Sequence, residues 1–387
     1  MKYLNLQETE LLGCGALYTA KEIEGQPALW KQTAEKFYSE AGEINIFLQA
    51  AYSSTDNIIL SGAGTSAFIG LSLQGIFSVN TNMLTRAVAT TDIVSHPQHY
   101  FNKTQTPFII SFARSGNSPE SCAALELADK FSKKCFHLII TCDENGALAK
   151  YKSCNATHVF VLPKEANDKS LAMTGSYTSM LLTGLLMAYI KQQHFCKTQI
   201  NLLVNAAEKI LSTSTEAIKK IAQKDFHRAV FLGSGGLFGT ATEAALKLQE
   251  LTDGQIICKA DTYLGFRHGP KAVIDENTIV IYFFSNNKYV QQYEIDLVNS
   301  MKIGNTTMFQ LGVCENITAE NGLNMQIDFG INNQEITEDF LTVCSILPGQ
   351  LLGFYKSLQL GLLPDAPSVS GAISRVVEGV HIYPVTA

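Results

Sequence analysis

The chain has 387 residues, which is long for one domain and makes two domains the natural expectation. Hydrophobic residues make up 46% of it and charged residues 17%, as in a globular protein with a large core. The net charge of −6 and the absence of a basic run argue against a nucleic-acid partner.

Cysteine usage and the terminal pattern indicate a cytoplasmic protein. The nine cysteines are scattered, with no C-x-x-C pair and no His/Cys cluster at zinc spacing, so we expect reduced thiols, no metal site and no cofactor. The N-terminus shows no apolar signal core. The most apolar run, Met180–Ile190, is too short to span a bilayer, so it predicts a buried helix and no membrane contact.

Residues 1–50 are patterned as polar helices with an interruption at Gln26-Pro27, and they predict an N-terminal helical arm. From residue 51 to 197, short apolar runs alternate with helical stretches. Continuous apolar runs are typical of strands covered on both faces, and this alternation predicts an α/β fold with a parallel sheet between helices. The runs are Ile58–Leu60, Phe108–Ile110, Leu138–Ile140 and Val159–Leu162.

Residues 201–364 repeat this pattern. A single shift of 171 residues carries Gly62 to Gly233, and the runs 108–112 and 138–140 to 279–283 and 309–311. One constant offset over three strands predicts two tandem doubly wound domains of the same fold, linked near residues 192–205. A tail from 365 to 387 follows, in which Val380–Tyr383 is a candidate edge strand.

Two strand-to-helix turns of the first domain are rich in hydroxyl groups. Thr65 and Ser66 follow the first strand, and Ser115, Asn117 and Ser118 follow the second. Unpaired N–H groups and the helix dipole favour a phosphate at a helix N-terminus, and turns after neighbouring parallel strands share one crevice. We therefore expect a phosphate there.

The second domain serves as an internal control. Its matching positions hold Gly236-Leu237 and Asn286-Asn287, so we expect no phosphate in that half. The alternative for the first domain is that its hydroxyls are ordinary helix caps. Arg114, in the second turn, either adds positive charge to the crevice or faces solvent.

The stretch 231–271 carries the candidate acid–base residues. Glu243, Lys247 and Glu250 stand at i, i+4 and i+7 on one helix face, beside an apolar stripe, and His268 follows in a loop. Carboxylates, a lysine and a histidine at the edge of a core suggest proton transfer. The simplest alternative is a solvated ion pair between Glu243 and Lys247, worth about 0.2–0.5 kcal/mol.

These motifs resemble those of a known family. The phrases SGAGTSAFIG and SFARSGNSPES are similar to the phosphosugar-binding loops of the sugar isomerase (SIS) domain, and the duplication is that of double-SIS enzymes with flavodoxin-like domains. EAALKLQE followed by HGP resembles the isomerase half of glucosamine-6-phosphate synthase. With FLGSGG, GFRHGPK and SVSGAISRVVEGV, the whole resembles the galactosamine-6-phosphate deaminase branch, also labelled tagatose-6-phosphate ketose/aldose isomerase.

The resemblance implies a reaction and a role for each residue. Galactosamine 6-phosphate would be converted to tagatose 6-phosphate and ammonia, with Glu250 as the base between C2 and C1. His268, supplied by the neighbouring subunit of a homodimer, would assist ring opening, and Lys247 and Glu243 would orient Glu250 and the substrate. The phosphate would be held by Thr65, Ser66, Ser115 and Ser118 with Arg114 and Asn117 in the same loop, and the sugar hydroxyls by Thr174 and Ser176.

The sequence departs from the family's motifs at two positions, and two alternative functions stay open. Ala113 stands where the family's second phosphate loop has a serine, and Arg375 is the only basic side chain in a tail where the synthase has a lysine. The alternative enzyme is an aldose–ketose isomerase or a deglycase acting on another sugar 6-phosphate. The alternative from another class is a phosphosugar-binding regulatory protein.

Overall fold

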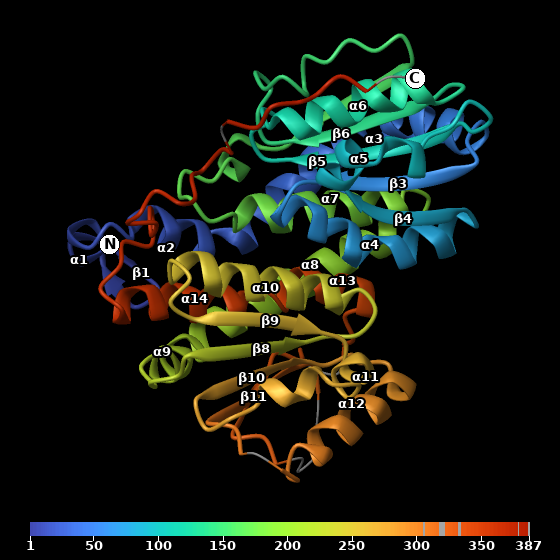
Figure 1. The fold of residues 1–387 in the computed structure, drawn as a ribbon. Coiled ribbons are helices and arrows are strands. Elements are labelled where there is room, and N and C mark those ends of the chain that lie inside the picture. Colours follow the sequence, from blue (N-terminus) through green and yellow to red (C-terminus); the bar gives the residue numbers. More distant parts are fainter. Residues whose placement is uncertain (305, 317–321, 332–333, 378, 386–387) are drawn as a thin grey trace. The chain divides into compact units, whose positions relative to one another are not determined.

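In the computed structural model of the chain, residues 1–304, 306–316, 322–331, 334–377 and 379–385 are described. The chain forms two compact units, each built around its own five-stranded sheet (Figure 1). Neither unit is a single stretch of chain. The first-sheet unit comprises Ala28–Asp168, Gly175–Lys197 and Ile373–Ala387, and the second-sheet unit comprises Met1–Pro27, Lys169–Thr174 and Thr198–Ala372.

The first-sheet unit alternates strands and helices. Helix α3, the last helix of the N-terminal region, starts just before this unit and runs into it. The elements are α3 (Gln26–Tyr52), β3 (Asn57–Gly62), α4 (Thr65–Thr81), β4 (Leu84–Ala89), α5 (Thr90–Ser95), η1 (Pro97–His99), β5 (Pro107–Ala113), α6 (Pro119–Phe131), β6 (Phe136–Thr141), β7 (Ala156–Val161), η2 (Lys164–Ala166) and α7 (Gly175–Ala188).

The second-sheet unit begins with the first short elements of the chain and resumes within α8, which passes from one unit to the other. Its elements are β1 (Lys2–Tyr3), β2 (Leu6–Gln7), α1 (Glu8–Gly13), α2 (Leu17–Glu24), α8 (Gln193–Thr213), α9 (Thr215–Ala222), β8 (Arg228–Leu232), α10 (Leu237–Leu251), β9 (Ile257–Asp261), α11 (Tyr263–Phe266), η3 (Pro270–Val273), β10 (Thr278–Phe283), α12 (Lys288–Ser300), β11 (Phe309–Cys314), β12 (Met325–Asp328), α13 (Glu338–Cys344) and α14 (Leu347–Gln359).

Both five-stranded sheets are parallel and have the same strand order. The first runs β4-β3-β5-β6-β7, and the second, read from its other edge, runs β9-β8-β10-β11-β12. In each, the strand that comes first in the chain lies second in the sheet, which is the flavodoxin-like doubly wound order. The predicted fold class, two such domains with an N-terminal helical region, is confirmed.

The predicted apolar runs lie in real strands, and the interior strands β3, β5, β6 and β10 are buried along their whole length. The edge strand β4 was missed because only Thr85 and Val88 of it are buried and it carries no continuous apolar run. The prediction of a strand at Val380–Tyr383 is wrong, since this segment has no regular secondary structure. The run 180–190 does fall in and just beyond the buried helix α7. Among the described residues, no helix is long and apolar enough to cross a membrane.

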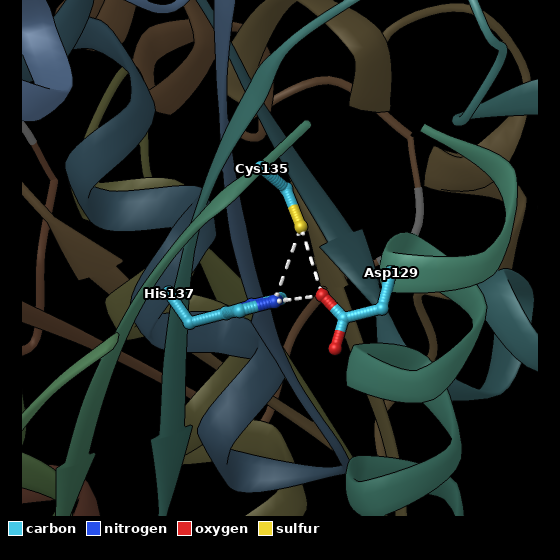
Figure 2. Close-up of side chains that lie close together, drawn as sticks. All are labelled: Asp129, Cys135 and His137. Atoms are coloured by element: carbon cyan, nitrogen blue, oxygen red, sulfur yellow. Dashed lines mark hydrogen bonds and ion pairs between the residues drawn. The ribbon is translucent and has the colours of Figure 1, made fainter. Parts of the chain in front are cut away.

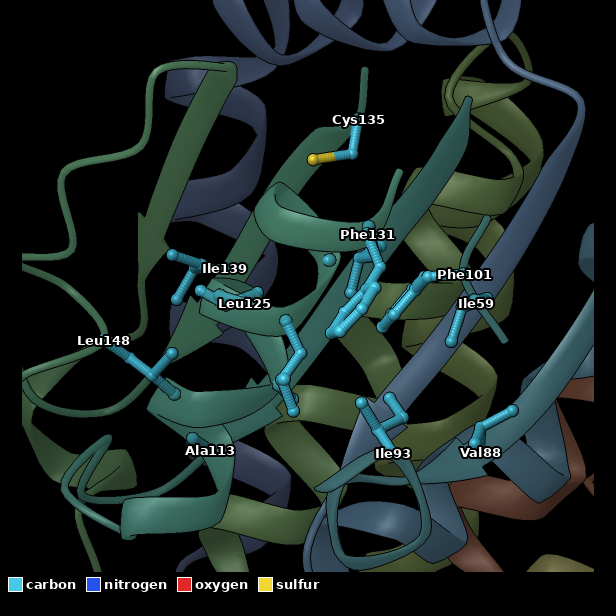
Figure 3. Packing of buried hydrophobic residues seen from close by; sticks show 14 residues of the cluster. Ile59, Val88, Ile93, Phe101, Ala113, Leu125, Phe131, Cys135, Ile139 and Leu148 are labelled. Atoms are coloured by element: carbon cyan, nitrogen blue, oxygen red, sulfur yellow. The ribbon is translucent and has the colours of Figure 1, made fainter. Parts of the chain in front are cut away.

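Helices cover the first sheet on both faces. On one face, α5 and α6 enclose a cluster that includes Ile59, Ile93 and Leu125 (Figure 3). On the other, α4 packs against α7, and the ring of Phe47 from α3 meets the ring of Phe108 on β5 at 6.0 Å. β3 and β5 pair directly in parallel, which places side by side the loops that follow them.

A polar cluster joins α6 to the amino end of β6. The Asp129 carboxylate accepts hydrogen bonds from His137 Nε2 at 2.8 Å and from Cys135 Sγ at 3.0 Å (Figure 2). Cys135 and His137 are fully buried, and the Asp129 side chain is 15% exposed. Burial alone would raise the pKa of Asp129, but hydrogen bonds, first of all from His137 and Cys135, hold that pKa well below its ordinary value.

In the second-sheet unit, α14 packs closely against the side of α10 that carries Ala244, Leu248 and Leu251. A Cβ added at Gly349 would lie 2.7 Å from Ala244 Cβ, and one at Gly353 would lie 3.2 Å from the Lys247 carbonyl oxygen. Both glycines of α14 are therefore needed for this approach. The opposite face of the sheet packs against α11 and α12.

Candidate active site

The turn after β3 is shaped to lead into the N-terminus of α4. A Cβ at Gly62 would lie 2.5 Å from the Ser66 carbonyl carbon, and Gly64 has φ of +54°, so both positions require glycine. The first helical residues, Thr65 and Ser66, are 5% and 4% exposed. Two hydroxyls thus lie at the start of a 17-residue helix, where the dipole favours an anion.

The turn after β5 is held by its own polar groups. The Asn117 side-chain oxygen accepts the Ala147 N–H at 2.9 Å, and Ser115 Oγ accepts the Asn117 N–H at 3.3 Å. Ser118 precedes α6 but makes no capping bond with its side chain, which instead pairs with Ser121 Oγ at 2.6 Å. The hydroxyl of Ser118 is therefore not used as a helix cap.

These two turns lie next to each other in the sheet. Ser61 of β3 pairs with Ser111 of β5 in parallel register, and the chain leaves β3 for β4 on one side before returning to β5 on the other. This is the topological switch point, outside which ligands bind in doubly wound sheets. The hydroxyl-rich turns predicted from the sequence are thus brought together within the first-sheet unit.

Arg114 is buried, so the alternative in which its side chain faces solvent is wrong. It is 6% exposed, and its Nη2 donates to the Arg375 carbonyl oxygen at 2.5 Å. The Arg375 guanidinium in turn donates to the Asp168 carbonyl oxygen at 3.0 Å and to Asn167 Oδ1 at 2.7 Å. Arg114 therefore fastens the C-terminal tail beside the second phosphate-loop candidate.

Thr174 and Ser176 flank the start of α7, and both are fully buried. Ser176 donates its N–H and its hydroxyl to Asp168 Oδ2, at 2.9 Å and 2.6 Å. Thr174 belongs to the second-sheet unit and Ser176 to the first-sheet unit. The hydroxyl of Ser176 is thus engaged by a carboxylate of this chain.

The charged row of α10 is present and is more deeply buried than the sequence suggested. Side-chain exposure is 0% for Glu243, 1% for Lys247 and 22% for Glu250. The Lys247 ammonium lies 2.5 Å from Glu250 Oε2 and 3.4 Å from Glu243 Oε1. The solvated ion pair considered above is ruled out by this burial. One lysine is shared by two carboxylates, and the outer carboxylate keeps access to solvent.

His268 lies beyond β9 in a loop shaped by Thr262 and Gly269. Thr262 Oγ1 accepts the Gly265 N–H at 3.0 Å, which starts α11, and Gly269 has φ of +115°. The His268 side chain is exposed. His268 and the α10 row belong to the second-sheet unit, whereas the hydroxyl-rich turns belong to the first-sheet unit.

The crevice of the second sheet is acidic where the first is rich in hydroxyls. Glu294 Oε2 accepts the Ser285 N–H at 3.0 Å, Ser285 Oγ donates to Glu338, and Asn286 Nδ2 donates to Glu315 Oε2 at 2.9 Å. Carboxylates of this chain thus occupy the donors that follow β10. That the second domain takes no phosphate stays a prediction.

Replacing Glu294 by glutamine should change how stability depends on pH. Burial raises the pKa of Glu294 to about 8, with repulsion from Glu338 adding to the effect. Between pH 4.5 and 8 the folded chain keeps a proton that the unfolded chain releases, so stability falls as pH rises, by up to about 1.4 kcal/mol per unit. Urea unfolding at pH 6, 7 and 8 should show a weaker decline in Glu294→Gln. An equal decline in both proteins would contradict the assignment.

Sequence reasoning missed two groups of residues. Asn167 and Asp168 meet Arg375 across more than 200 positions of chain, so no local pattern reveals them. The cluster of Asp129, Cys135 and His137 brings three metal-ligand types within 4.8 Å of one another. Its signal, an acid six residues before C-x-H, matches no established spacing. None of the cysteines in the described chain forms a disulfide, as expected.

Comparison with known proteins gives concordant matches. A model of the SIS domain matches residues 51–190. The D-galactosamine-6-phosphate deaminase AgaS of Shewanella sp. (strain ANA-3) is 38% identical, over 98% of this chain and 95% of its own. The solved structure of tagatose-6-phosphate ketose/aldose isomerase from Escherichia coli has 32% identity and a TM-score of 0.85, covering 96% and 97% of the two chains. A structure from Clostridium novyi NT reaches 39% identity and a TM-score of 0.96 over all of both chains.

Proposed function

This chain belongs to the galactosamine-6-phosphate deaminase (AgaS) family of SIS-domain proteins, and from that membership we propose that it converts galactosamine 6-phosphate to tagatose 6-phosphate and ammonia. The observation that carries the proposal is the α10 row, in which a buried lysine holds one oxygen of a partly exposed carboxylate. A row of this kind supplies a fixed base beside a cation, as enolisation requires.

The first-sheet crevice supports a phosphosugar as substrate. Two helix N-termini with buried or half-buried hydroxyls, at Thr65, Ser66, Ser115 and Ser118, follow neighbouring strands. Phosphate binding there would orient C1 and C2 of the sugar without taking part in the chemistry. Arg114 and Asn117 would shape the second turn, and Thr174 and Ser176 the entry to α7.

Glu250 is proposed as the base that moves a proton from C2 to C1. Its Oε2 is held by Lys247 at 2.5 Å, which leaves Oε1 to take the C2 proton of the open-chain aldehyde and to return it to C1. Removal, with O1 taking a proton from the 2-ammonium group of the substrate, gives an enolamine, and protonation at C1 gives an iminium at C2. Water adds to C2 and ammonia leaves, so that the product is a ketose 6-phosphate. Glu243, on the far side of Lys247, would keep the ammonium in place.

His268 is proposed to move the proton between the anomeric hydroxyl and the ring oxygen as the sugar ring opens. Its side chain is exposed on the second-sheet unit. An exposed histidine can serve the site of a neighbouring subunit, and we propose a homodimer whose two active sites each use the histidine of the other protomer.

An aldose–ketose isomerase is the second candidate, favoured by the name of the solved Escherichia coli relative. The same C2-to-C1 proton transfer serves both reactions, and only the C2 substituent differs. The test is to supply galactosamine 6-phosphate and glucosamine 6-phosphate in parallel and to measure ammonium. Ammonium from the galacto sugar supports the deaminase. If neither sugar yields ammonium while an aldose phosphate is isomerised, the second candidate replaces it.

Replacing Ser118 by alanine should raise KM and leave kcat almost unchanged. A hydrogen bond to a charged group contributes about 1.5–3 kcal/mol, so KM should rise about 10- to 100-fold. A contact equally strong in the ground and transition states affects KM alone. Initial rates over a range of substrate concentrations give both constants.

Ser121→Ala is the matched control, because it removes the other hydroxyl of the Ser118–Ser121 pair and leaves the Ser118 hydroxyl in the phosphate loop. Its KM should stay near the wild-type value. Equal KM in Ser118→Ala and the wild type would remove Ser118 from the phosphate site.

A further inference from the structure

The cluster of Asp129, Cys135 and His137 lies away from the proposed active site. Cys135 directly precedes β6 and His137 is its second residue, so the cluster is at the amino end of the strand. The hydroxyl-rich turns follow the carboxyl ends of β3 and β5. In a parallel sheet these ends lie opposite the amino end of β6. The reaction proposed above makes no use of these three side chains.

The three ligand atoms already converge (Figure 2). Cys135 Sγ lies 3.2 Å from His137 Nε2 and 3.0 Å from Asp129 Oδ1, and the imidazole nitrogen lies 2.8 Å from that oxygen. A tetrahedral zinc ion holds sulfur at about 2.3 Å and nitrogen or oxygen at about 2.0–2.2 Å, which separates ligand atoms by roughly 3.3–3.6 Å. Movements of about half an ångström would therefore open the cluster to a metal ion.

We propose that Asp129, Cys135 and His137 bind a divalent metal ion of the zinc type, with Cys154 as the fourth ligand. Thiolate, imidazole and carboxylate together form a donor set suited to zinc. Cys154 is exposed and lies outside the group of ligand atoms that converge within 4.8 Å, so its side chain must turn inward to reach the metal. The side-chain nitrogen of Asn155, Nδ2, contacts both residues: it lies 3.6 Å from Cys154 Sγ and 2.9 Å from Asp129 Oδ1.

The groups around Asp129 form the outer shell that such a site needs. Tyr151 OH and Ser153 Oγ each donate to Asp129 Oδ2 at 2.7 Å, and Asn155 Nδ2 donates to Oδ1. These three bonds remain when a metal replaces the hydrogen bonds from Cys135 and His137. Outer-shell bonds of this kind orient ligands, and each is typically worth about 10- to 100-fold in metal affinity.

Metal binding releases two protons to solvent and moves a third within the His137 ring. Asp129 is already ionised, and each of the two thiols releases a proton to solvent when its sulfur bonds to the metal. The proton on His137 Nε2 moves to Nδ1, which frees the Nε2 lone pair. Nδ1 is buried and has no hydrogen-bond partner in the described chain, so this shift breaks only the bond to Asp129. An imidazole without an outer acceptor predicts a weaker site than structural zinc sites have.

Cobalt(II) titration of the full-length, metal-stripped protein tests the proposal. Cobalt bound by thiolate gives a sulfur-to-metal charge-transfer band in the near ultraviolet and tetrahedral ligand-field bands in the visible. We expect these bands to saturate at one equivalent of cobalt and to disappear when zinc is added. Zinc should also raise the midpoint of thermal unfolding.

Cys154→Ser is the informative variant, because the residue is exposed and its loss leaves the core intact. It should weaken cobalt binding at least about tenfold and reduce the charge-transfer band, whereas Cys122→Ser, a half-buried cysteine of α6, should change neither. Cys135→Ser should abolish the band. A folded wild type without a thiolate band at saturating cobalt, or a band that survives both Cys135→Ser and Cys154→Ser, would overturn the proposal.

Discussion

Replacing Glu250 by glutamine should lower turnover about 10²- to 10⁴-fold, the range typical of a lost general acid–base group. The amide keeps the shape of the side chain but cannot accept the C2 proton. The hydroxyl-rich turns lie on the other unit and are untouched, so KM should change little. Steady-state ammonium release from galactosamine 6-phosphate measures both constants.

Glu276→Gln is the matched control for this variant. It makes the same chemical change at an exposed position outside the proposed site, and it should keep wild-type kinetics. A Glu250→Gln enzyme that also keeps near-normal turnover would remove Glu250 from the role of base and leave Glu243 as the next carboxylate to test.

Replacing Lys247 by methionine should destabilise the second-sheet unit by about 3–5 kcal/mol, the usual cost of removing one partner from a buried charge pair. Lys247 is 1% exposed and lies between Glu243 and Glu250. Without its ammonium, the fully buried Glu243 carboxylate loses the cation at 3.4 Å. Urea unfolding followed by circular dichroism should show a lower midpoint.

The double variant Lys247→Met/Glu243→Gln is the control. It removes the fully buried anion together with the cation, and it should recover most of the lost stability, because the remaining carboxylate, Glu250, is partly exposed. Two results would contradict this account: a Lys247→Met protein as stable as the wild type, or a double variant no more stable than the single one.

The sequence predicts the fold well where one local pattern decides the outcome. The interior strands β3, β5, β6 and β10 are buried on both faces, so each appears as a continuous apolar run. The edge strand β4 is buried at only two positions and carries no such run. Val380–Tyr383 has apolar residues but no regular secondary structure, because a strand also needs a hydrogen-bonded neighbour, which spacing cannot supply.

The candidate site was predictable in its residues and less so in its environment. Helical spacing placed Glu243, Lys247 and Glu250 on one face, but that spacing did not predict how deeply the three side chains are buried. The partners of Arg114 were not predictable, because its contact with Arg375 spans 261 positions. Long-range packing decides such features, and a single sequence carries no local signal for them.

The most direct test of the proposed function is product stoichiometry. Galactosamine 6-phosphate is incubated with the enzyme, and ammonium and tagatose 6-phosphate are quantified in the same sample. The account predicts one of each per substrate consumed, with both products formed about 10²- to 10⁴-fold more slowly by Glu250→Gln. Ammonium without the ketose, or a ketose formed from an aldose phosphate with no ammonium released from the amino sugar, would contradict a deaminating isomerisation at this site.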